Sequence, residues 1–287
     1  MKSSLTALPQ PRRKLRILLA EDNPVNQRVA VAILEGRGHE LIVAKNGREA
    51  IDLFQRESFD IILMDVQMPE MDGFEATAAI REMERLTGGH IPIIAMTAYA
   101  LKGDEERCLS SGMDDYISKP VLRQKLIQMV EKFSVTLDSS NSESDPREPE
   151  SLEGGDGRSE DAREPHSTKD VKSLPEALFD PAQALDMVGG RIDLLKEMIT
   201  IFAEQSSDLL SEIQHSIEQL DSRKLERAAH TLKGSVSNFG AREALNAAAR
   251  MEKLGRDDEL AQAGSFYDEL ERRIERLAYV LKIYYSS

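Results

Sequence analysis

The sequence is poor in cysteine, in long apolar runs and in positive charge. Its single cysteine, Cys108, excludes an internal disulfide and fits a reducing compartment. No apolar run approaches the ~20 residues that cross a bilayer, and the N-terminal segment lacks the apolar core of a signal peptide. The net charge is −14, and neither half of the chain has the basic face that nucleic-acid binding needs. We therefore expect a cytoplasmic protein that neither spans a membrane nor binds nucleic acid.

The negative charge is concentrated near the middle of the chain. Between residues 138 and 170, 11 acidic and 4 basic residues give a net charge of −7, half of the total. The surrounding segment lacks aromatic residues and hydrophobic periodicity, so it cannot bury enough apolar surface to offset the entropy of ordering. We interpret it as a flexible acidic linker. The predicted organisation is an N-terminal tail, a first domain, this linker and a second domain, over residues 1–14, 15–134, 135–177 and 178–287.

In the first domain, short apolar runs alternate with amphipathic segments. Continuous apolar runs of this length are typical of parallel strands that helices cover on both faces. The expected strands are residues 15–20, 41–44, 60–64, 91–96 and 115–118, and the expected helices lie near 24–36, 47–57, 73–86, 101–111 and 121–133. Strict alternation of strands and helices predicts a flavodoxin-like α/β domain with a five-stranded parallel sheet.

In the second domain, from Phe179 onward, apolar residues recur at helical spacing and no strand candidate is strong. Several amphipathic helices of this length predict an all-α helical bundle. Gly240 and Gly255 are expected to mark breaks between helices.

Polar side chains follow four of the predicted strands. Glu21-Asp22 follow the first strand, and Asp65, Thr97 and Lys119 end the third, fourth and fifth. The carboxyl ends of parallel strands meet at one edge of a sheet, so these groups should lie together. Three carboxylates there would repel one another without a cation, and Mg²⁺ suits oxygen ligands. The pattern predicts that Asp65 accepts a phosphoryl group while Mg²⁺, Lys119 and Thr97 stabilise the charge on its oxygens.

The amino-acid sequences of these segments form specific motifs. The motifs are Leu18-Leu19-Ala20-Glu21-Asp22-Asn23, Met64-Asp65-Val66-Gln67-Met68-Pro69-Glu70-Met71-Asp72-Gly73, Ala95-Met96-Thr97-Ala98 and Asp115-Tyr116-Ile117-Ser118-Lys119-Pro120. With them, residues 15–133 resemble the receiver domain of two-component response regulators. The resemblance implies that Asp65 is the phosphoacceptor, and that Mg²⁺ is held by Glu21, Asp22, Asp65 and the backbone carbonyl of Gln67.

The same resemblance implies a conformational switch. Thr97 and Tyr116 would form the switch pair, the ring turning inward as the Thr97 hydroxyl moves to the phosphate. Pro120 would follow a cis peptide bond that aims Lys119. Many receivers have aspartate where this chain has Glu21, and the extra methylene is expected to change the metal geometry slightly.

A second candidate phosphoacceptor, His230, lies in the helical domain. It shares a predicted helix face with Lys233 and Gly234, at spacings i, i+3 and i+4. The apolar residues of that helix point elsewhere, so we expect His230 to face solvent, where a docked receiver can reach it. Lys233 supplies positive charge near the incoming phosphoryl group, and Gly234 lets a partner approach closely.

The segment His230-Thr231-Leu232-Lys233-Gly234-Ser235, with Asn238-Phe239-Gly240 after it, looks like a histidine-containing phosphotransfer (Hpt) domain. This resemblance covers about residues 178–287. It implies that His230 carries the phosphoryl group and serves a separate downstream receiver.

Together the two domains predict a phosphorelay. A partner histidine kinase would phosphorylate Asp65, which would exchange the phosphoryl group with His230, and His230 would serve a downstream response regulator. Two alternatives stay open: the chain is the C-terminal part of a hybrid sensor histidine kinase, or Asp65 is a binding switch without internal transfer. No segment resembles an ATP-binding kinase domain, so this chain alone is not expected to use ATP. A hydrolase with Asp65 as nucleophile fits less well, because Gln67 stands where such phosphatases place a second carboxylate.

Overall fold

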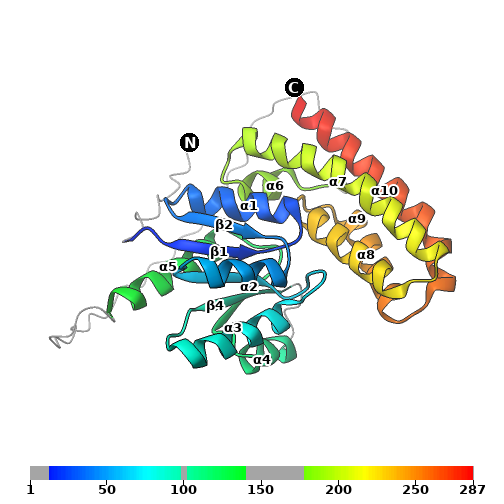
Figure 1. Cartoon of the computed structure of the whole chain (residues 1–287). Helices are drawn as coiled ribbons and strands as arrows, with labels where there is room; N and C mark the ends of the chain where they lie inside the picture. The colour runs from blue at the N-terminus through cyan, green and yellow to red at the C-terminus, as the bar shows by residue number, and fades with distance from the viewer. Residues whose placement is uncertain (1–12, 98–101, 140–177, 287) are drawn as a thin grey trace, which may run out of the picture.

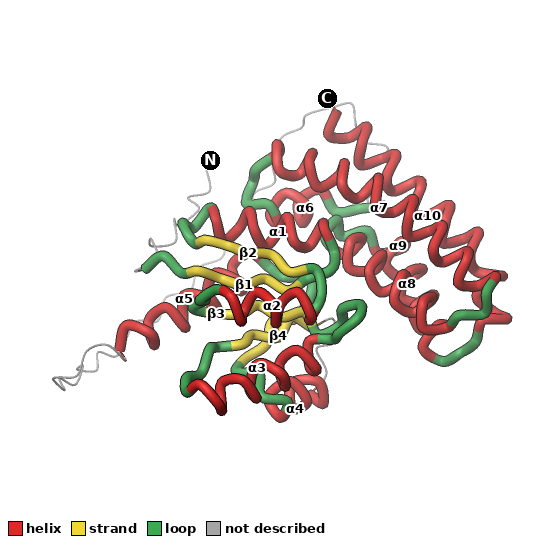
Figure 2. The backbone as a smooth tube through the Cα atoms, in the orientation of Figure 1, coloured by secondary structure: helices red, strands yellow, loops and turns green. Residues whose placement is uncertain are grey.

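The computed structural model describes residues 13–97, 102–139 and 178–286 (Figure 1). These residues form an α/β domain followed by a domain of helices (Figure 2), in agreement with the predicted fold class. Most of the predicted tail and linker lies outside the described residues. The last helix of the first domain continues to Ser139, beyond the end expected at residue 133.

Five parallel strands form the sheet, in the order β2-β1-β3-β4-β5. They are β1 (Arg16–Ala20), β2 (Glu40–Ala44), β3 (Ile61–Asp65), β4 (Ile93–Thr97) and β5 (Asp115–Ser118). After β1 the chain moves outward to β2, then returns past β1 to β3. Ligand sites of open α/β sheets lie where the strand order reverses in this way. The segments after β1 and β3, which carry Glu21-Asp22 and Asp65, meet at this point.

Helices cover both faces of the sheet. They are α1 (Pro24–Glu35), α2 (Gly47–Arg56), α3 (Gly73–Thr87), α4 (Lys102–Ser110) and α5 (Arg123–Ser139). In β1, Ile17 and Leu19 pack with residues of α1 and α5, whereas Leu18 and Ala20 pack with residues of α2 and α3. Because helices cover both faces of the sheet, the strands need apolar side chains on both of their sides.

The start of α1 is determined by its capping residue. The side-chain oxygen of Asn23 accepts hydrogen bonds from the backbone N–H groups of Val25 and Asn26, and Pro24 occupies the first turn. Both features are typical of helix N-termini, as predicted. Because the cap oxygen faces α1, the Asn23 amide nitrogen points away from the helix.

The second domain is a bundle. Its helices are α6 (Pro181–Met187), α7 (Ile192–Glu218), α8 (Ser222–Ser237), α9 (Arg242–Arg256) and α10 (Leu260–Ser286). Helices α7, α8, α9 and α10 each pack against two of the others, which closes a four-helix bundle. Buried aromatic rings of α7 and the α8–α9 connection, Phe202 and Phe239, meet at a centroid distance of 5.1 Å in the core.

The two glycines expected to break helices behave differently. Gly240 lies between α8 and α9 with a φ of 63°, a left-handed conformation that glycine adopts easily. Gly255 instead lies inside α9, so the prediction of a break there was wrong by one residue. A Cβ added at Gly255 would lie 2.5 Å from the backbone nitrogen of Glu226 on α8. The glycine therefore permits close packing of α8 against α9.

The two domains contact each other through α1, which packs against α7 and α8. At the edge of this contact, the Arg28 guanidinium and the Glu197 carboxylate form two parallel hydrogen bonds of 2.7 Å each. The contact brings the carboxyl edge of the sheet, which carries Asp65, next to helix α8, which carries His230 (Figure 1).

Candidate functional site

Three carboxylates converge at the carboxyl edge of the sheet. Glu21, Asp22 and Asp65 each offer an oxygen, and these oxygens lie within 4.8 Å of one another. Burial, followed by the charge of Glu21, raises the pKa of Asp22 to about 6. Burial also raises the pKa of Asp65, which is 2% exposed. The cluster is therefore under electrostatic strain that a bound cation would relieve.

The side-chain amine of Lys119 places a positive charge among these buried carboxylates. The amine lies 2.7 Å from Asp65 Oδ2 and 2.6 Å from Glu21 Oε2. Although burial opposes the charged form, Asp65 and Glu21 together raise the pKa of Lys119, so the amine stays protonated. The Lys119–Pro120 peptide bond is cis, as the resemblance to receivers implied.

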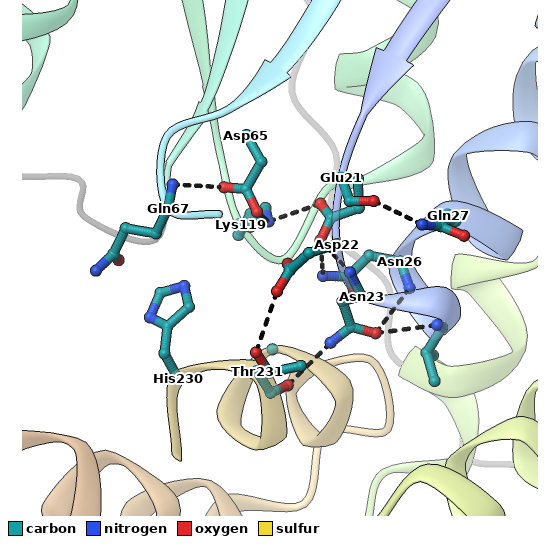
Figure 3. Close-up of polar contacts among 12 residues, drawn as sticks. Glu21, Asp22, Asn23, Asn26, Gln27, Asp65, Gln67, Lys119, His230 and Thr231 are labelled. Atoms are coloured by element: carbon teal, nitrogen blue, oxygen red, sulfur yellow. Dashed lines mark hydrogen bonds and ion pairs between the residues drawn. The ribbon is translucent and has the colours of Figure 1, made fainter. Parts of the chain in front are cut away.

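The loop after β3 completes this side of the site. The backbone N–H of Gln67 donates a 3.2 Å hydrogen bond to Asp65 Oδ1 (Figure 3). The role of the Gln67 carbonyl as a metal ligand stays a prediction. An N–H directed at Asp65 suits a negatively charged group, because a preorganised donor stabilises anionic oxygens.

The proposed switch residues lie on neighbouring strands. Thr97 is buried at the end of β4, beside the acidic cluster. Tyr116, on β5, is partly buried, and its hydroxyl donates a 3.0 Å hydrogen bond to Glu105 on α4. The ring is thus held toward α4 in this structure, and its predicted inward movement stays a prediction.

His230 is buried, with 8% exposure, so the expectation that it faces solvent was wrong. Two elements cover it. Helix α9 places Glu252 against the ring, with Oε1 at 2.7 Å from Nδ1, and the receiver edge covers the side of α8 that would otherwise meet solvent. Burial lowers the pKa of His230, even though the hydrogen bond with Glu252 raises it. A neutral imidazole with Nδ1–H held by a carboxylate presents its Nε2 lone pair for reaction.

Glu252 is a residue of the site that the sequence analysis missed. Its Oε2 lies 2.5 Å from the Lys233 amine, and Arg256 donates to Oε1, the oxygen that contacts His230, at 3.0 Å. Burial raises the pKa of Glu252, but hydrogen bonds from His230 and Lys233 outweigh this and lower it to about 2. Glu252 lies on the next helix, and no spacing in the sequence relates it to His230. The predicted pair of His230 and Lys233 is therefore joined by a shared carboxylate.

Asp65 and His230 line the same cavity, of about 280 Å³, between the two domains. Figure 3 shows the His230 ring directed toward the loop that carries Gln67 and Asp65. The domains approach closely here, since a Cβ at Gly234 would lie 3.3 Å from the Asn23 amide nitrogen. The structure thus brings together the two predicted phosphoacceptors.

Side-chain hydrogen bonds join the domains around this cavity. The Asn23 amide donates to the Thr231 carbonyl at 2.9 Å and to Ser235 Oγ at 2.8 Å. The Thr231 hydroxyl donates a longer bond, of 3.4 Å, to Asp22 Oδ2. None of these contacts was predicted, because they connect positions about two hundred residues apart in the sequence.

Comparison with known proteins assigns both domains. Residues 17–131 match the family model of the response regulator receiver domain, and residues 197–279 match that of the Hpt domain. The first region is 40% identical over 117 residues to the polar-differentiation response regulator DivK of Brucella anthropi, covering 41% of this chain and 94% of DivK. The chain belongs to the response regulator receiver family and carries an Hpt domain.

The similarity extends beyond the receiver domain. Sensor histidine kinase GacS of Pseudomonas protegens is 31% identical over 268 residues, covering 93% of this chain and 27% of GacS. Among solved structures, the receiver domain of sensor histidine kinase PA1611 from Pseudomonas aeruginosa, with a magnesium ion in its active site cleft, is 41% identical. The match covers 43% of this chain and 99% of the PA1611 receiver domain, with a TM-score of 0.40. The two domains and the similarity to GacS support phosphorelay signalling.

The chain spans about a quarter of the length of the GacS proteins that it matches. Within its described residues, no helix combines the length and apolar character needed to cross a membrane.

Proposed function

We propose that this receiver–Hpt chain relays a phosphoryl group between Asp65 and His230. A histidine kinase would supply the group to Asp65, and the receiver of a downstream response regulator would take it from His230. The observation that carries this proposal is the shared cavity, in which the two acceptors face each other across the docked domains. The reducing compartment that a single cysteine favours is the cytoplasm.

The transfer step follows from the geometry of the two acceptors. The Nε2 lone pair of His230 attacks the phosphorus of the Asp65 acyl phosphate, a P–N bond forms, and the P–O bond to Asp65 breaks. The Asp65 carboxylate takes the electron pair, and its charge is held by Lys119 at 2.7 Å. Glu252 keeps the proton on Nδ1 and stabilises the positive charge that develops on the ring. The step is reversible, because the freed Asp65 carboxylate can attack the phosphorus of phosphohistidine, re-forming the P–O bond as the P–N bond breaks.

The acidic cluster fits Mg²⁺. Glu21, Asp22 and Asp65 provide hard oxygen ligands within 4.8 Å of one another, and their mutual repulsion favours a divalent cation. Bound there, Mg²⁺ would neutralise charge on the phosphoryl oxygens. We expect Thr97, which is buried at the end of β4, to donate a hydrogen bond to the same oxygens.

The docked arrangement also imposes an order of events. While the domains are in contact, the cavity that Asp65 and His230 share lies between them and is lined by residues of both domains. Neither a kinase histidine nor a downstream aspartate can reach them in this state. The domains must therefore separate before the chain receives a phosphoryl group and again before it passes the group on.

The direct test is phosphorylation of the whole chain with acetyl phosphate and Mg²⁺, followed by mass spectrometry. We expect label on both Asp65 and His230 in the wild type, no label on either in Asp65→Asn, and label on Asp65 alone in His230→Gln. His215→Gln, at an exposed histidine of α7, is the matched control and should behave as wild type. Label on His230 in Asp65→Asn, or its absence from wild type, would contradict internal transfer.

If label stays on Asp65 alone in wild type, the binding switch becomes the better explanation. Label on both residues in wild type would remain compatible with a hybrid kinase fragment, because internal transfer does not depend on what else the protein contains.

A further inference from the structure

A continuous set of side-chain hydrogen bonds leads from the Hpt domain to the acidic cluster. Asn238, at the end of α8, donates from Nδ2 to Asn26 Oδ1 at 2.9 Å. Asn26, on α1, donates from Nδ2 to Glu21 Oε1 at 3.1 Å. Glu21 in turn holds Lys119 through Oε2. The docked Hpt domain is therefore two hydrogen bonds away from a candidate cation ligand.

The direction of these hydrogen bonds is determined by the backbone of α8. The Asn238 amide nitrogen also donates to the carbonyl oxygens of Gly234, at 3.1 Å, and Ser235, at 3.3 Å. These carbonyls are acceptors only, so the group that Asn238 turns toward α1 is an NH₂. Asn26 must meet it with its oxygen, which leaves its own NH₂ facing Glu21. Asn238 and the acceptor-only Glu21 carboxylate thus hold the Asn26 amide in the same orientation from its two ends.

Asn26 is partly exposed. When the Hpt domain leaves, the Asn26 oxygen loses its donor and the side chain is held by Glu21 alone, so it can rotate away and leave Glu21 Oε1 without a side-chain partner. In the docked state, Oε1 is occupied by Asn26 and the backbone N–H of Asn23, at 3.3 Å. Oε2 is then directed toward Asp65 and Lys119, where a cation would bind.

We propose that Asn26 couples docking of the Hpt domain to cation binding at Glu21, so that the docked chain binds Mg²⁺ more tightly than the separated chain. The inference rests on the proposed function, since it concerns the cation of the same site. Because linkage is reciprocal, Mg²⁺ strengthens docking by the same factor. The cation then favours the arrangement in which Asp65 and His230 share a cavity.

The test measures Mg²⁺ affinity of the unphosphorylated whole chain by isothermal titration calorimetry. One intramolecular hydrogen bond typically changes an equilibrium by about 2- to 10-fold, so Asn238→Ala should lower Mg²⁺ affinity by about that factor. Asn246→Ala is the matched control, because Asn246 lines the same cavity from α9 and makes no described hydrogen bond to the receiver. It should bind Mg²⁺ as wild type does.

A double-mutant cycle shows whether the effect passes through Asn26. In an Asn26→Ala background, Asn238→Ala should have no further effect on Mg²⁺ affinity. The isosteric Asn238→Asp keeps the size of the side chain and replaces the donor with an acceptor. It should turn the Asn26 amide around and lower Mg²⁺ affinity at least as much as Asn238→Ala does.

Wild-type Mg²⁺ affinity in both Asn238 variants would overturn the proposal. So would an equal loss of Mg²⁺ affinity on Asn238→Ala in the wild-type and Asn26→Ala backgrounds. Acetyl phosphate labelling of the same variants separates this result from the relay itself. Transfer to His230 without coupling would overturn only the present inference, and coupling without transfer would overturn only the relay.

Discussion

Asp65 and His230 are both buried, but different parts of the molecule bury them. The aspartate site is assembled inside one domain, from residues at the carboxyl ends of β1, β3, β4 and β5. The environment of His230 comes from α9, through Glu252, and from the edge of the other domain. The aspartate site therefore comes from the receiver domain alone, whereas part of the cover over His230 comes from the other domain.

This difference has a chemical consequence. Acyl phosphate formation at Asp65 needs strong charge neutralisation, and a rigid sheet edge holds carboxylates and an amine in place for it. In the proposed relay, His230 needs only an accessible Nε2 and a correctly placed proton, and it would serve more than one partner. A site on a helix surface can do this because partners dock and leave.

The largest expected effect is on the aspartate side. Replacing Lys119 with methionine removes the cation that contacts Asp65 and Glu21. Labelling of Asp65 by acetyl phosphate should slow by roughly 100-fold or more, since loss of one charge-stabilising donor typically costs about 10²–10³ in rate. Lys132→Met, at an exposed ion pair with Asp115, is the control. Equal rates in the two variants would show that Lys119 has no part in the reaction.

On the histidine side, Glu252→Gln should affect the second step alone. Glutamine can still accept a hydrogen bond from Nδ1 but carries no charge to stabilise the ring. We expect transfer from Asp65 to His230 to slow by about 10- to 100-fold, the usual cost of losing a carboxylate that orients a histidine. Labelling of Asp65 should stay at the wild-type rate. Glu269→Gln, at a surface ion pair on α10, is the control, and a slower first step in Glu252→Gln would contradict a role confined to His230.

Docking should depend on pH through His230. Burial lowers the pKa of His230 in the docked state, so the separated state gains a proton first as the pH falls. The contribution of His230 to docking is fully present above pH ~6.5, the ordinary value, and is lost progressively below it. Small-angle X-ray scattering at pH 7.5 and 5.5 should show more separated wild-type protein at the lower pH.

Asp22 acts in the same pH range but in the opposite direction, because burial raises its pKa to about 6 and a falling pH then favours the state in which it is buried. His230→Gln isolates the histidine contribution, since it retains Asp22. The pH dependence of docking should be weaker in this variant than in wild type. An unchanged dependence would assign the effect to other groups.

The smallest expected effect concerns the edge of the interface. Arg28 and Glu197 are partly exposed, at 28% and 47% for their side chains, and exposed pairs contribute about 0.2–1 kcal/mol. Arg28→Glu should slow internal transfer by roughly 2- to 5-fold, with a smaller difference at high salt. The reversed pair, Arg28→Glu with Glu197→Arg, should recover most of the loss. No recovery would mean that these residues do not meet during transfer.

Most of the aspartate site could be predicted because it follows from the chain direction. Buried parallel strands have continuous apolar sequences, and whatever follows them lies at one edge of the sheet. Glu21, Asp22, Asp65 and Lys119 all lie where this rule places them. Neither Glu252 nor the buried state of His230 could be predicted in this way. Helical periodicity separates the apolar face of a helix from its polar face, but it does not say which neighbour covers the polar one.

The sequence by itself determined the two domains, their fold classes and the two candidate phosphoacceptors, because apolar periodicity and local motifs depend on neighbours within a few residues. Only the tertiary structure decided that α1 packs against α8, that Glu252 holds His230 and that Asn238 reaches Glu21 through Asn26. These contacts join polar side chains far apart in the sequence. Their energies are small and depend on geometry within a few tenths of an ångström, so no residue pattern predicts these contacts.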